Sequence, residues 1–174
     1  MVKRALLFVA ILSSFSFSRN LSLEQFAGVE LGYGAMESKN AMNSSESNRG
    51  FDFGLKVGVQ NYDWRTAFST NYFKEDKHES LNTLLSVDKF LFAGIYETED
   101  TIMKPYIGAN LGWLKYKDSD LDIKDSDITY GFQLGFVWGL SSKLDFDFGY
   151  RHSFTAIEEV SRVDIFSLSL NYIF

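Results

Sequence analysis

Five aspartates within ten residues form the densest cluster of possible metal ligands in this 174-residue sequence. They are Asp118, Asp120, Asp122, Asp125 and Asp127. Calcium prefers carboxylate oxygens, but an EF-hand loop beginning at Asp118 would need Gly at its sixth position and Glu at its twelfth, where this chain has Ile123 and Thr129. We therefore expect a solvated acidic loop, with weak contact to divalent ions as the alternative. The sequence predicts neither a dedicated metal site nor a cofactor.

The pair His152 and Ser153 is a second candidate for chemistry, because an imidazole can accept the proton of a serine nucleophile. The two residues are adjacent, however, and adjacent side chains of a β-strand point to opposite faces. Cysteine is absent, which excludes a thiol nucleophile and a disulfide framework. We expect no catalytic residue and predict that the protein is not an enzyme.

A third group consists of charged residues that alternate with large apolar ones, so that all of them share one face of their segments. They are Glu30, Asp52, Lys56, Arg65, Asp88, Asp145, Asp147 and Arg151. Charges in a common interior must be paired or hydrated. The pattern favours a structural ion-pair network, in which Arg151 bridges to Glu30 or Asp52, and a selective pore is the alternative.

Eight segments carry these residues, each with the period of two that is typical of a β-strand. They span residues 25–36, 51–60, 64–73, 81–92, 105–116, 128–140, 144–154 and 163–174. The fourth segment has an unclear phase. Strict alternation points Lys89 outward, whereas a bulge there would turn Phe90 and Phe92 outward.

The positions of the glycines distinguish a predicted membrane barrel from a soluble β-sandwich. Of the 13 glycines, 11 alternate with the large apolar residues and so lie on the polar face. A narrow barrel needs them there, because its strands coil tightly and its interior holds few side chains. The other face is large and apolar, as lipid requires. The sequence thus predicts an all-β fold, an eight-stranded antiparallel up-and-down transmembrane β-barrel.

The connecting segments indicate an orientation. Those at 37–50, 74–80, 117–127 and 155–162 are long and polar, and those at 61–63 and 141–143 are tight, while 93–104 is long for a periplasmic turn. Bacterial barrels place long loops outside, so we expect both termini in the periplasm. Two aromatic girdles are expected. The periplasmic one would hold Trp64, Trp138, Tyr172 and Phe174, and the outer one Tyr72, Tyr116, Tyr130 and Tyr150.

Residues 1–18 have the pattern of a secretory signal peptide, which leaves 19–174 as the barrel domain. Lys3 and Arg4 precede an apolar run from residue 5 to 12, and Ser16 and Ser18 stand at the −3 and −1 positions of a cleavage site. Removal of the signal changes the net charge from −6 to −8, which argues against a nucleic-acid partner.

The C-terminal segment looks like the assembly signal of outer-membrane barrel proteins, with alternating Phe166, Leu168, Leu170, Tyr172 and a terminal Phe174. The stretch Phe148-Gly149-Tyr150-Arg151-His152 is similar to the penultimate strand of the same group. The mature chain therefore resembles the small eight-stranded barrels: the OmpA transmembrane domain, OmpX and the opacity-type, porin-like surface proteins. In the related lipid A deacylase barrel the catalytic His and Ser stand two apart, with Asn following, whereas here Phe154 follows the adjacent pair.

This resemblance implies a cellular location more firmly than a function. It implies the bacterial outer membrane, contact with outer-membrane lipid and lipopolysaccharide, insertion by the barrel assembly machinery, and a monomer. The expected function is a structural and surface-interaction scaffold, an adhesion-type surface protein whose four exposed loops contact a host or cell-surface ligand. The alternative is a narrow channel for ions or small solutes.

Overall fold

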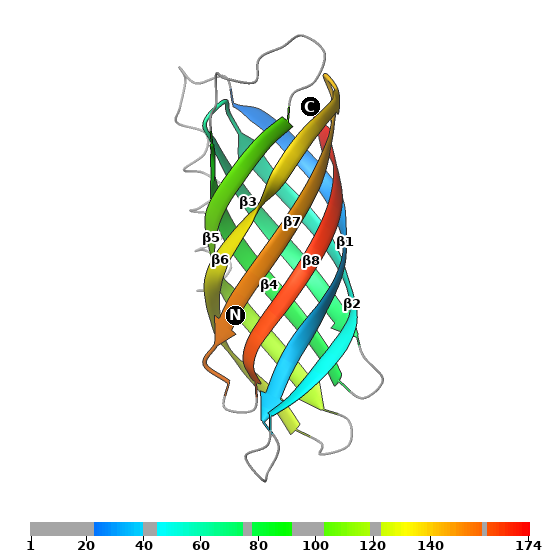
Figure 1. Cartoon of the computed structure of the whole chain (residues 1–174), viewed down its shortest axis with the longest axis vertical. Coiled ribbons are helices and arrows are strands. Elements are labelled where there is room, and N and C mark those ends of the chain that lie inside the picture. Colours follow the sequence, from blue (N-terminus) through cyan, green and yellow to red (C-terminus); the bar gives the residue numbers. More distant parts are fainter. Residues whose placement is uncertain (1–22, 40–44, 75–77, 92–102, 119–122, 158–159) are drawn as a thin grey trace, which may run out of the picture.

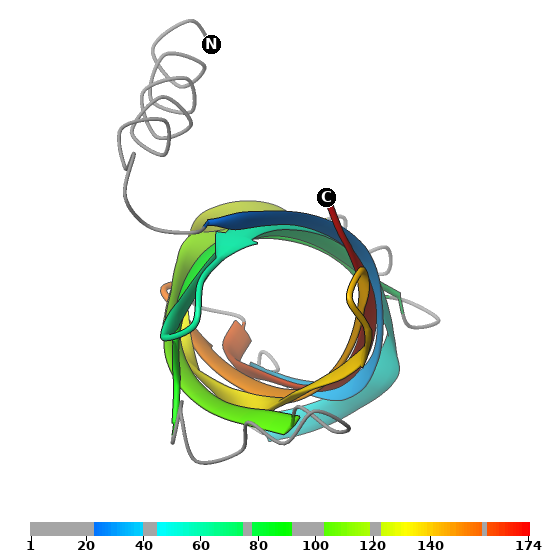
Figure 2. The ribbon, with the colours of Figure 1, turned by 90° about the horizontal axis from the view of Figure 1, so that it is seen from above.

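Eight strands form a closed antiparallel barrel in which each strand pairs with its neighbours in the chain and β8 pairs with β1 (Figures 1 and 2). The computed structural model describes residues 23–39, 45–74, 78–91, 103–118, 123–157 and 160–174. The strands are β1 (Glu24–Lys39), β2 (Ser45–Gln60), β3 (Trp64–Lys74), β4 (His78–Phe90), β5 (Met103–Asp118), β6 (Ile123–Ser141), β7 (Leu144–Thr155) and β8 (Val160–Ile173). The predicted eight-stranded barrel is confirmed.

Two ends of the barrel are distinguished by their connections. At the hairpin end, residues 40–44, 75–77, 119–122 and 156–159 join the strands of four hairpins. The terminal end carries the start of β1, the C-terminus and the other three connections, and it lies uppermost in Figure 1. The predicted signal peptide lies outside the described residues, and no helix in the described ranges is long and apolar enough to cross a membrane.

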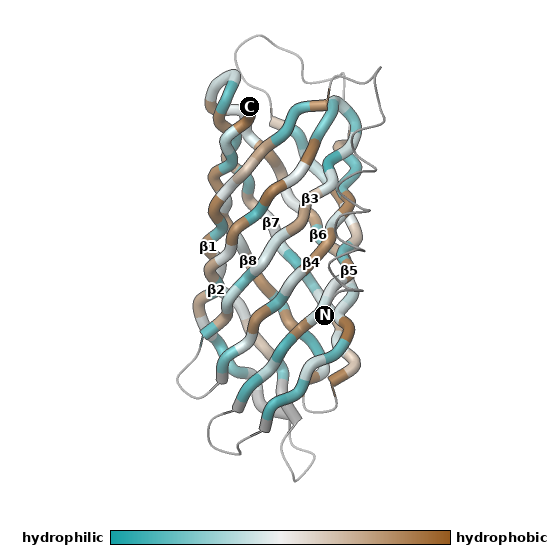
Figure 3. The backbone as a smooth tube through the Cα atoms, turned by 180° about the vertical axis from the view of Figure 1, so that it is seen from behind, coloured by the Kyte–Doolittle hydropathy of each residue, from teal (hydrophilic) through white to brown (hydrophobic). Residues whose placement is uncertain are grey.

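The outward face of the barrel is apolar all the way round. Outward side chains such as Leu31, Phe51 and Leu55 are 62 %, 75 % and 59 % exposed. Figure 3 shows the alternation along every strand, with hydrophobic and hydrophilic positions in turn. A belt of this extent requires an apolar solvent, and the closed ladder leaves no unpaired backbone edge in it.

The strands extend further toward the hairpin end than the sequence pattern predicts. Each of the segments 37–50, 74–80, 117–127 and 155–162, predicted as long loops, is part strand, with β1 and β2 paired as far as Lys39 and Ser45. The physical reason is that outward residues beyond the apolar belt need not be apolar. Alternation therefore ends before backbone pairing does. The tight turns are confirmed, at residues 61–63 and at 142–143, with Ser141 still in β6.

Strand β4 continues in regular phase. It pairs with β3 and β5 without a register shift, so the alternative of a bulge at Lys89 is wrong. Lys89 points outward, where its Nζ donates to Asp63 Oδ1 at 2.9 Å and lies 5.0 Å from the ring centroid of Trp64. Phe90 is buried in the interior, and Phe92 lies outside the described residues.

One predicted girdle residue faces the wrong way. Tyr116 is 4 % exposed and belongs to an interior cluster, because Trp113 and Lys115 face outward and Tyr116 follows them on the opposite face. The other predicted girdle side chains point outward. They are Trp64, Tyr72, Trp138, Tyr130, Tyr172 and Phe174, which are exposed, and the half-buried Tyr150.

Candidate functional site

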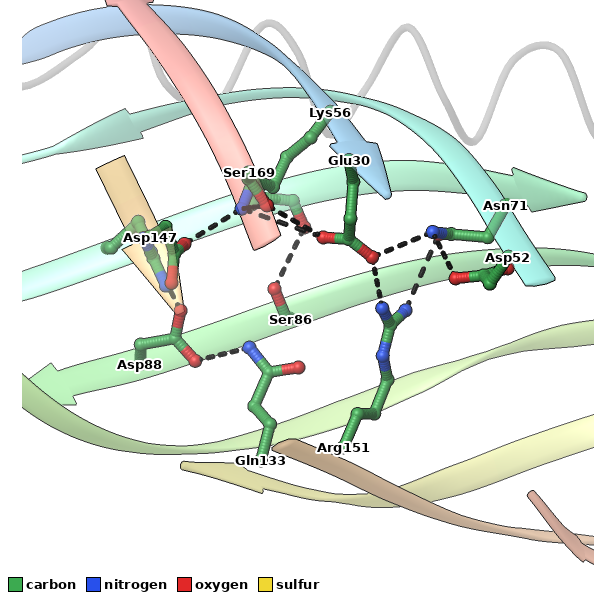
Figure 4. Close-up of polar contacts among 12 residues, drawn as sticks. Glu30, Asp52, Lys56, Asn71, Ser86, Asp88, Gln133, Asp147, Arg151 and Ser169 are labelled. Atoms are coloured by element: carbon green, nitrogen blue, oxygen red, sulfur yellow. Dashed lines mark hydrogen bonds and ion pairs between the residues drawn. The ribbon is translucent and has the colours of Figure 1, made fainter. Parts of the chain in front are cut away.

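All eight charged residues predicted to share one face lie inside the barrel, and none is more than 8 % exposed. They come from β1, β2, β3, β4 and β7, and alternation along each strand is what turns them inward. Figure 4 shows most of them meeting in the lumen.

Arg151 on β7 and Glu30 on β1 form the first ion pair of the interior, through Nη2 and Oε1. Asn71 on β3 links this pair to Asp52, because its Nδ2 donates to Glu30 Oε1 at 2.8 Å and to Asp52 Oδ2 at 3.1 Å. Of the two carboxylates expected for Arg151, it therefore pairs with Glu30 and reaches Asp52 through the amide of Asn71.

Asp147 is the acceptor at the centre of a second group. Lys56 Nζ donates to it at 2.9 Å, Arg65 Nη1 at 2.7 Å and the Tyr106 hydroxyl at 3.1 Å. Arg65 Nε also pairs with Asp88 at 2.8 Å. The Arg65 guanidinium is thus held between two carboxylates from different strands.

Lys56 connects the two groups. Its Nζ lies 3.8 Å from Glu30 Oε2 and donates to Ser169 Oγ at 3.1 Å, while Ser169 donates to Glu30 at 3.2 Å. The interior charges therefore form one network. The exception is Asp145, which accepts a hydrogen bond from Gln60 at 3.1 Å and joins none of the ion pairs in the described part of the chain.

The sequence interpretation missed several neutral members of the network. The most consequential are Asn71, Tyr106 and Gln133, whose Nε2 donates to Asp88 at 2.6 Å. All three stand at inward positions, so the same alternation that identified the charges was the signal for them.

Apolar layers enclose this polar network on both sides. Toward the hairpin end lies a buried cluster of Met36, Phe73, Leu114, Tyr116, Ile157, Val160, Val163 and Ile165. Toward the terminal end lie Phe90, Tyr106 and Val137, and the Arg65 guanidinium carbon sits 4.5 Å from the Tyr106 ring centroid. The ion-paired charges therefore lie between two groups of apolar side chains, and Asp145 stands two residues nearer the terminal end than Asp147.

Glycine makes room for large aromatic side chains in the interior. A Cβ on Gly58 would lie 2.7 Å from the Phe26 ring, and one on Gly149 would lie 2.6 Å from the Tyr106 hydroxyl oxygen. Both distances are below any normal contact, so the rings occupy the space of the missing side chains. This is the close approach expected of glycine inside a strand.

Little free volume remains in the lumen. One cavity of about 20 Å³ lies among Glu30, Lys56, Arg65 and Asp147, and a second of about 10 Å³ lies between Arg151 and the hairpin-end cluster. One water needs roughly 10–15 Å³ of such space. The two cavities thus have room for isolated waters, and Asn82, whose Oδ1 is buried without a hydrogen-bond partner among the described residues, lines the second.

No group of three or more metal-ligating side chains is found among the described residues. Asp125 and Asp127 accept hydrogen bonds from the following backbone N–H groups of Ser126 and Ile128, at 2.7 Å each. Asp120, Asp122 and the side chain of Asp118 lie outside what the structure describes.

His152 and Ser153 point to opposite faces, as their adjacency predicts. His152 faces outward, with Nδ1 2.5 Å from Asp164 Oδ1, and Ser153 faces the lumen and donates to Asn110 Oδ1 at 3.1 Å. The imidazole therefore cannot activate the Ser153 hydroxyl.

Residues 6–174 match the family model for the outer membrane protein β-barrel domain. The chain belongs to this family. A comparison with curated proteins finds no match. Membership places this barrel in the bacterial outer membrane, where the apolar belt faces lipid.

Solved outer-membrane barrels have the same fold. The chain is similar to Neisserial surface protein A, with a TM-score of 0.70, 19 % identity, and coverage of 86 % of this chain and 97 % of that one. For outer membrane protein H of P. aeruginosa the TM-score is 0.60 and the identity 22 %, with coverage of 87 % of this chain and 99 % of that one. For the N-terminal barrel domain of Pseudomonas aeruginosa OprF the TM-score is 0.59 and the identity 14 %, with coverage of 84 % of this chain and 97 % of that one. At these identities the likeness concerns the fold.

Proposed function

We propose that this outer-membrane barrel is a closed scaffold that presents its hairpin end outside the cell for contact with a surface ligand. The observation that carries the proposal is the interior, where paired charges lie between two apolar layers and leave space for isolated waters. Such a lumen supports a rigid frame rather than a path for solutes. In this proposal the protein has no catalytic activity and functions as a monomer.

The channel alternative requires a continuous row of water through the lumen. Each cation of the network already has a carboxylate within ion-pair distance, so no unpaired cation remains to attract a permeating anion. Opening the lumen would also require the apolar layers to part. Burying an unpaired charge costs several kcal/mol per ion, which favours the closed arrangement.

The proposed orientation puts the hairpin end outside and both termini in the periplasm. It is supported by the tight turn at residues 142–143 of the terminal end and by the paired, polar hairpins at the other end. The sequence has no cysteine, so a single introduced thiol reports unambiguously. Ser126→Cys near the hairpin end should react with a membrane-impermeant maleimide on intact cells, and Ser142→Cys should not.

Binding at the hairpin end is tested with a variant in which connections 40–44, 75–77, 119–122 and 156–159 are replaced by two-residue turns. We expect the intact barrel to bind host cells or a neighbouring bacterial surface, and the trimmed barrel to insert normally but lose that binding. Equal binding by both would contradict the scaffold role. The matched control changes the turn at residues 61–63 instead.

A further inference from the structure

The smaller cavity of the lumen lies between the ion-pair network and the apolar cluster of the hairpin end. Its free volume is about 10 Å³, which is room for one particle of the size of a water molecule. Every side chain that lines it is buried. Side chains of three strands offer oxygen atoms to it: Asp52 of β2, Ser80 and Asn82 of β4, and Ser153 of β7.

Asp52 is the one carboxylate of the ion-pair network that has no cation within ion-pair distance in the described part of the chain. Glu30, Asp88 and Asp147 each have such a cation. The side-chain partner of Asp52 is Asn71, whose Nδ2 donates to Oδ2 at 3.1 Å, and Figure 4 shows that Asp52 joins the network through this amide. A carboxylate accepts several ligands, so Asp52 has capacity for another.

The ion-pair network carries one negative charge in excess. It contains four carboxylates and three cations, which are Glu30, Asp52, Asp88 and Asp147 against Lys56, Arg65 and Arg151. An uncompensated charge in a closed interior is costly, so the excess must be neutralised. The geometry places it at Asp52, because each cation is already held by another carboxylate. Arg151, which also lines the cavity, is bonded to Glu30 and Asn71.

Asn82 points independently to a ligand in the same cavity. Its side chain is 9 % exposed, and its Oδ1 is buried without a hydrogen-bond partner among the described residues. Buried polar atoms are almost always paired, so this oxygen calls for a partner. Rotation of the carboxamide about the Cβ–Cγ bond can turn the oxygen into the cavity. Ser80, two residues away on the same face of β4, adds a hydroxyl oxygen.

We propose that this cavity binds one small monovalent metal cation, such as sodium, through the carboxylate of Asp52 and the neutral oxygens of β4 and β7. Hard cations prefer oxygen ligands of these kinds. A single positive charge equals the excess of the network, whereas a divalent ion would exceed it and would find one carboxylate at the site. The volume admits the cation without its shell of water.

This site adds to the scaffold role a dependence of the frame on monovalent cations. The ion would tie β2, β4 and β7 together directly below the hairpin-end cluster. The ion pairs on one side and the apolar cluster on the other enclose it, so it is a structural ion and not one in transit. Two other occupants are distinguishable. A water molecule would satisfy Asn82 but leave the excess charge, and a proton on Asp52 would remove that charge without any metal.

Urea unfolding in zwitterionic detergent tests the site, because a ligand of the folded state lowers the equilibrium constant of unfolding by the factor 1 + [ligand]/Kd. The full mature chain is measured at about pH 8, where a solvated carboxyl group is ionised. Sodium, caesium and choline chlorides are compared at one ionic strength, from folded and from unfolded protein. We expect sodium at about 150 mM to lower the unfolding constant about tenfold relative to choline, as for a Kd of about 15 mM. Caesium, which is too large for the cavity, should act like choline.

Two variants that each remove one interior carboxylate provide the matched comparison. Asp52→Asn keeps the size of the side chain and should abolish the difference between sodium and choline. Asp145→Asn should preserve it, since Asp145 is also buried without an ion pair in the described part of the chain but lies toward the terminal end. Asn82→Leu, which removes the amide oxygen at similar volume, should weaken the apparent affinity for sodium at least threefold.

Equal stability of the unmodified protein in sodium and choline would overturn the cation site. A gain in stability at lower pH, absent from Asp52→Asn, would in that case assign the neutralisation to a proton. A sodium effect that survives Asp52→Asn, or that Asp145→Asn also abolishes, would overturn the assignment to this cavity. Equal effects of sodium and caesium would do the same, because a cavity of this size must select by radius. If Asp52→Asn does not fold, Asn82→Leu against Asp145→Asn makes the same comparison, and an unchanged sodium affinity in Asn82→Leu contradicts the site.

Discussion

Arg151 and Glu30 show how single residues hold the interior together. Both are buried, and they come from β7 and β1, which are not neighbours in the sheet. Their ion pair therefore spans β8 on the inner side of the barrel wall. Removing one partner leaves the other charge buried, which costs far more than the pair contributes relative to apolar residues.

Arg151→Met should accordingly lower the free energy of unfolding in urea by about 3 kcal/mol, the range for a broken buried pair. Glu30 keeps Lys56 at 3.8 Å and the Asn71 amide, so we expect the lower end of that range. The double variant Arg151→Met with Glu30→Gln should recover part of the loss, since no unpaired carboxylate remains. Simple additivity of the two single changes would contradict the ion pair.

Gly149 and Tyr106 give a second test at the same scale. The hydroxyl of Tyr106 is the one close neighbour that a Cβ at Gly149 would meet, since the next two atoms are 3.4 and 3.8 Å away. Gly149→Ala should therefore cost about 1–3 kcal/mol of stability by overpacking. In a Tyr106→Phe background, which itself loses a hydrogen bond to Asp147, the same change should cost clearly less. Equal costs in both backgrounds would show that the hydroxyl is not the obstacle.

Among the strands, β8 carries the predicted assembly signal and closes the barrel against β1. Its outward residues Phe166, Leu168, Leu170 and Tyr172 are exposed to the surroundings of the barrel, as is Phe174, which follows the strand. Phe174 also donates its backbone N–H to Gln25 O at 3.0 Å, so the last residue takes part in closure.

Deleting Phe174 should therefore reduce the amount of protein inserted in the outer membrane several-fold. It removes both an exposed aromatic of the terminal end and the hydrogen bond to β1. Deleting Ser142, an exposed turn residue, should have a much smaller effect. Quantitative immunoblots of outer-membrane fractions measure both, and equal amounts would argue against a special role of the terminus.

The sequence predicted the facing of residues better than the extent of strands. Period-two alternation placed Asp88, Tyr106 and Asp147 inward, because every second residue of a strand faces the interior and the sequence shows this directly. It failed for the ends of β1 and β2, where both faces are polar, and for Tyr116, which aromatic character alone had assigned to a girdle. Cross-lumen partners such as Arg65 and Asp147 could not be predicted, because they depend on the stagger of strands around the closed barrel.

At the scale of the whole molecule, closure of the barrel is the main source of resistance to unfolding. All eight strands are paired on both sides, so unfolding has no free edge at which to begin. The folded protein should resist SDS at room temperature and shift in electrophoretic mobility after boiling. Identical migration before and after boiling, with the unheated sample shown to be membrane-inserted, would contradict a closed barrel of this stability.

A closed lumen distinguishes a scaffold from a channel. Conductance across a planar lipid bilayer measures directly whether the lumen is closed. The paired charges and the two apolar layers predict that the unmodified protein, inserted from detergent, gives no steady current above background. Arg151→Ala, which leaves Glu30 without its principal cation, should show raised, irregular leakage in the same bilayers. A large, steady and ion-selective current from the unmodified protein would contradict the closed lumen and make the barrel a channel.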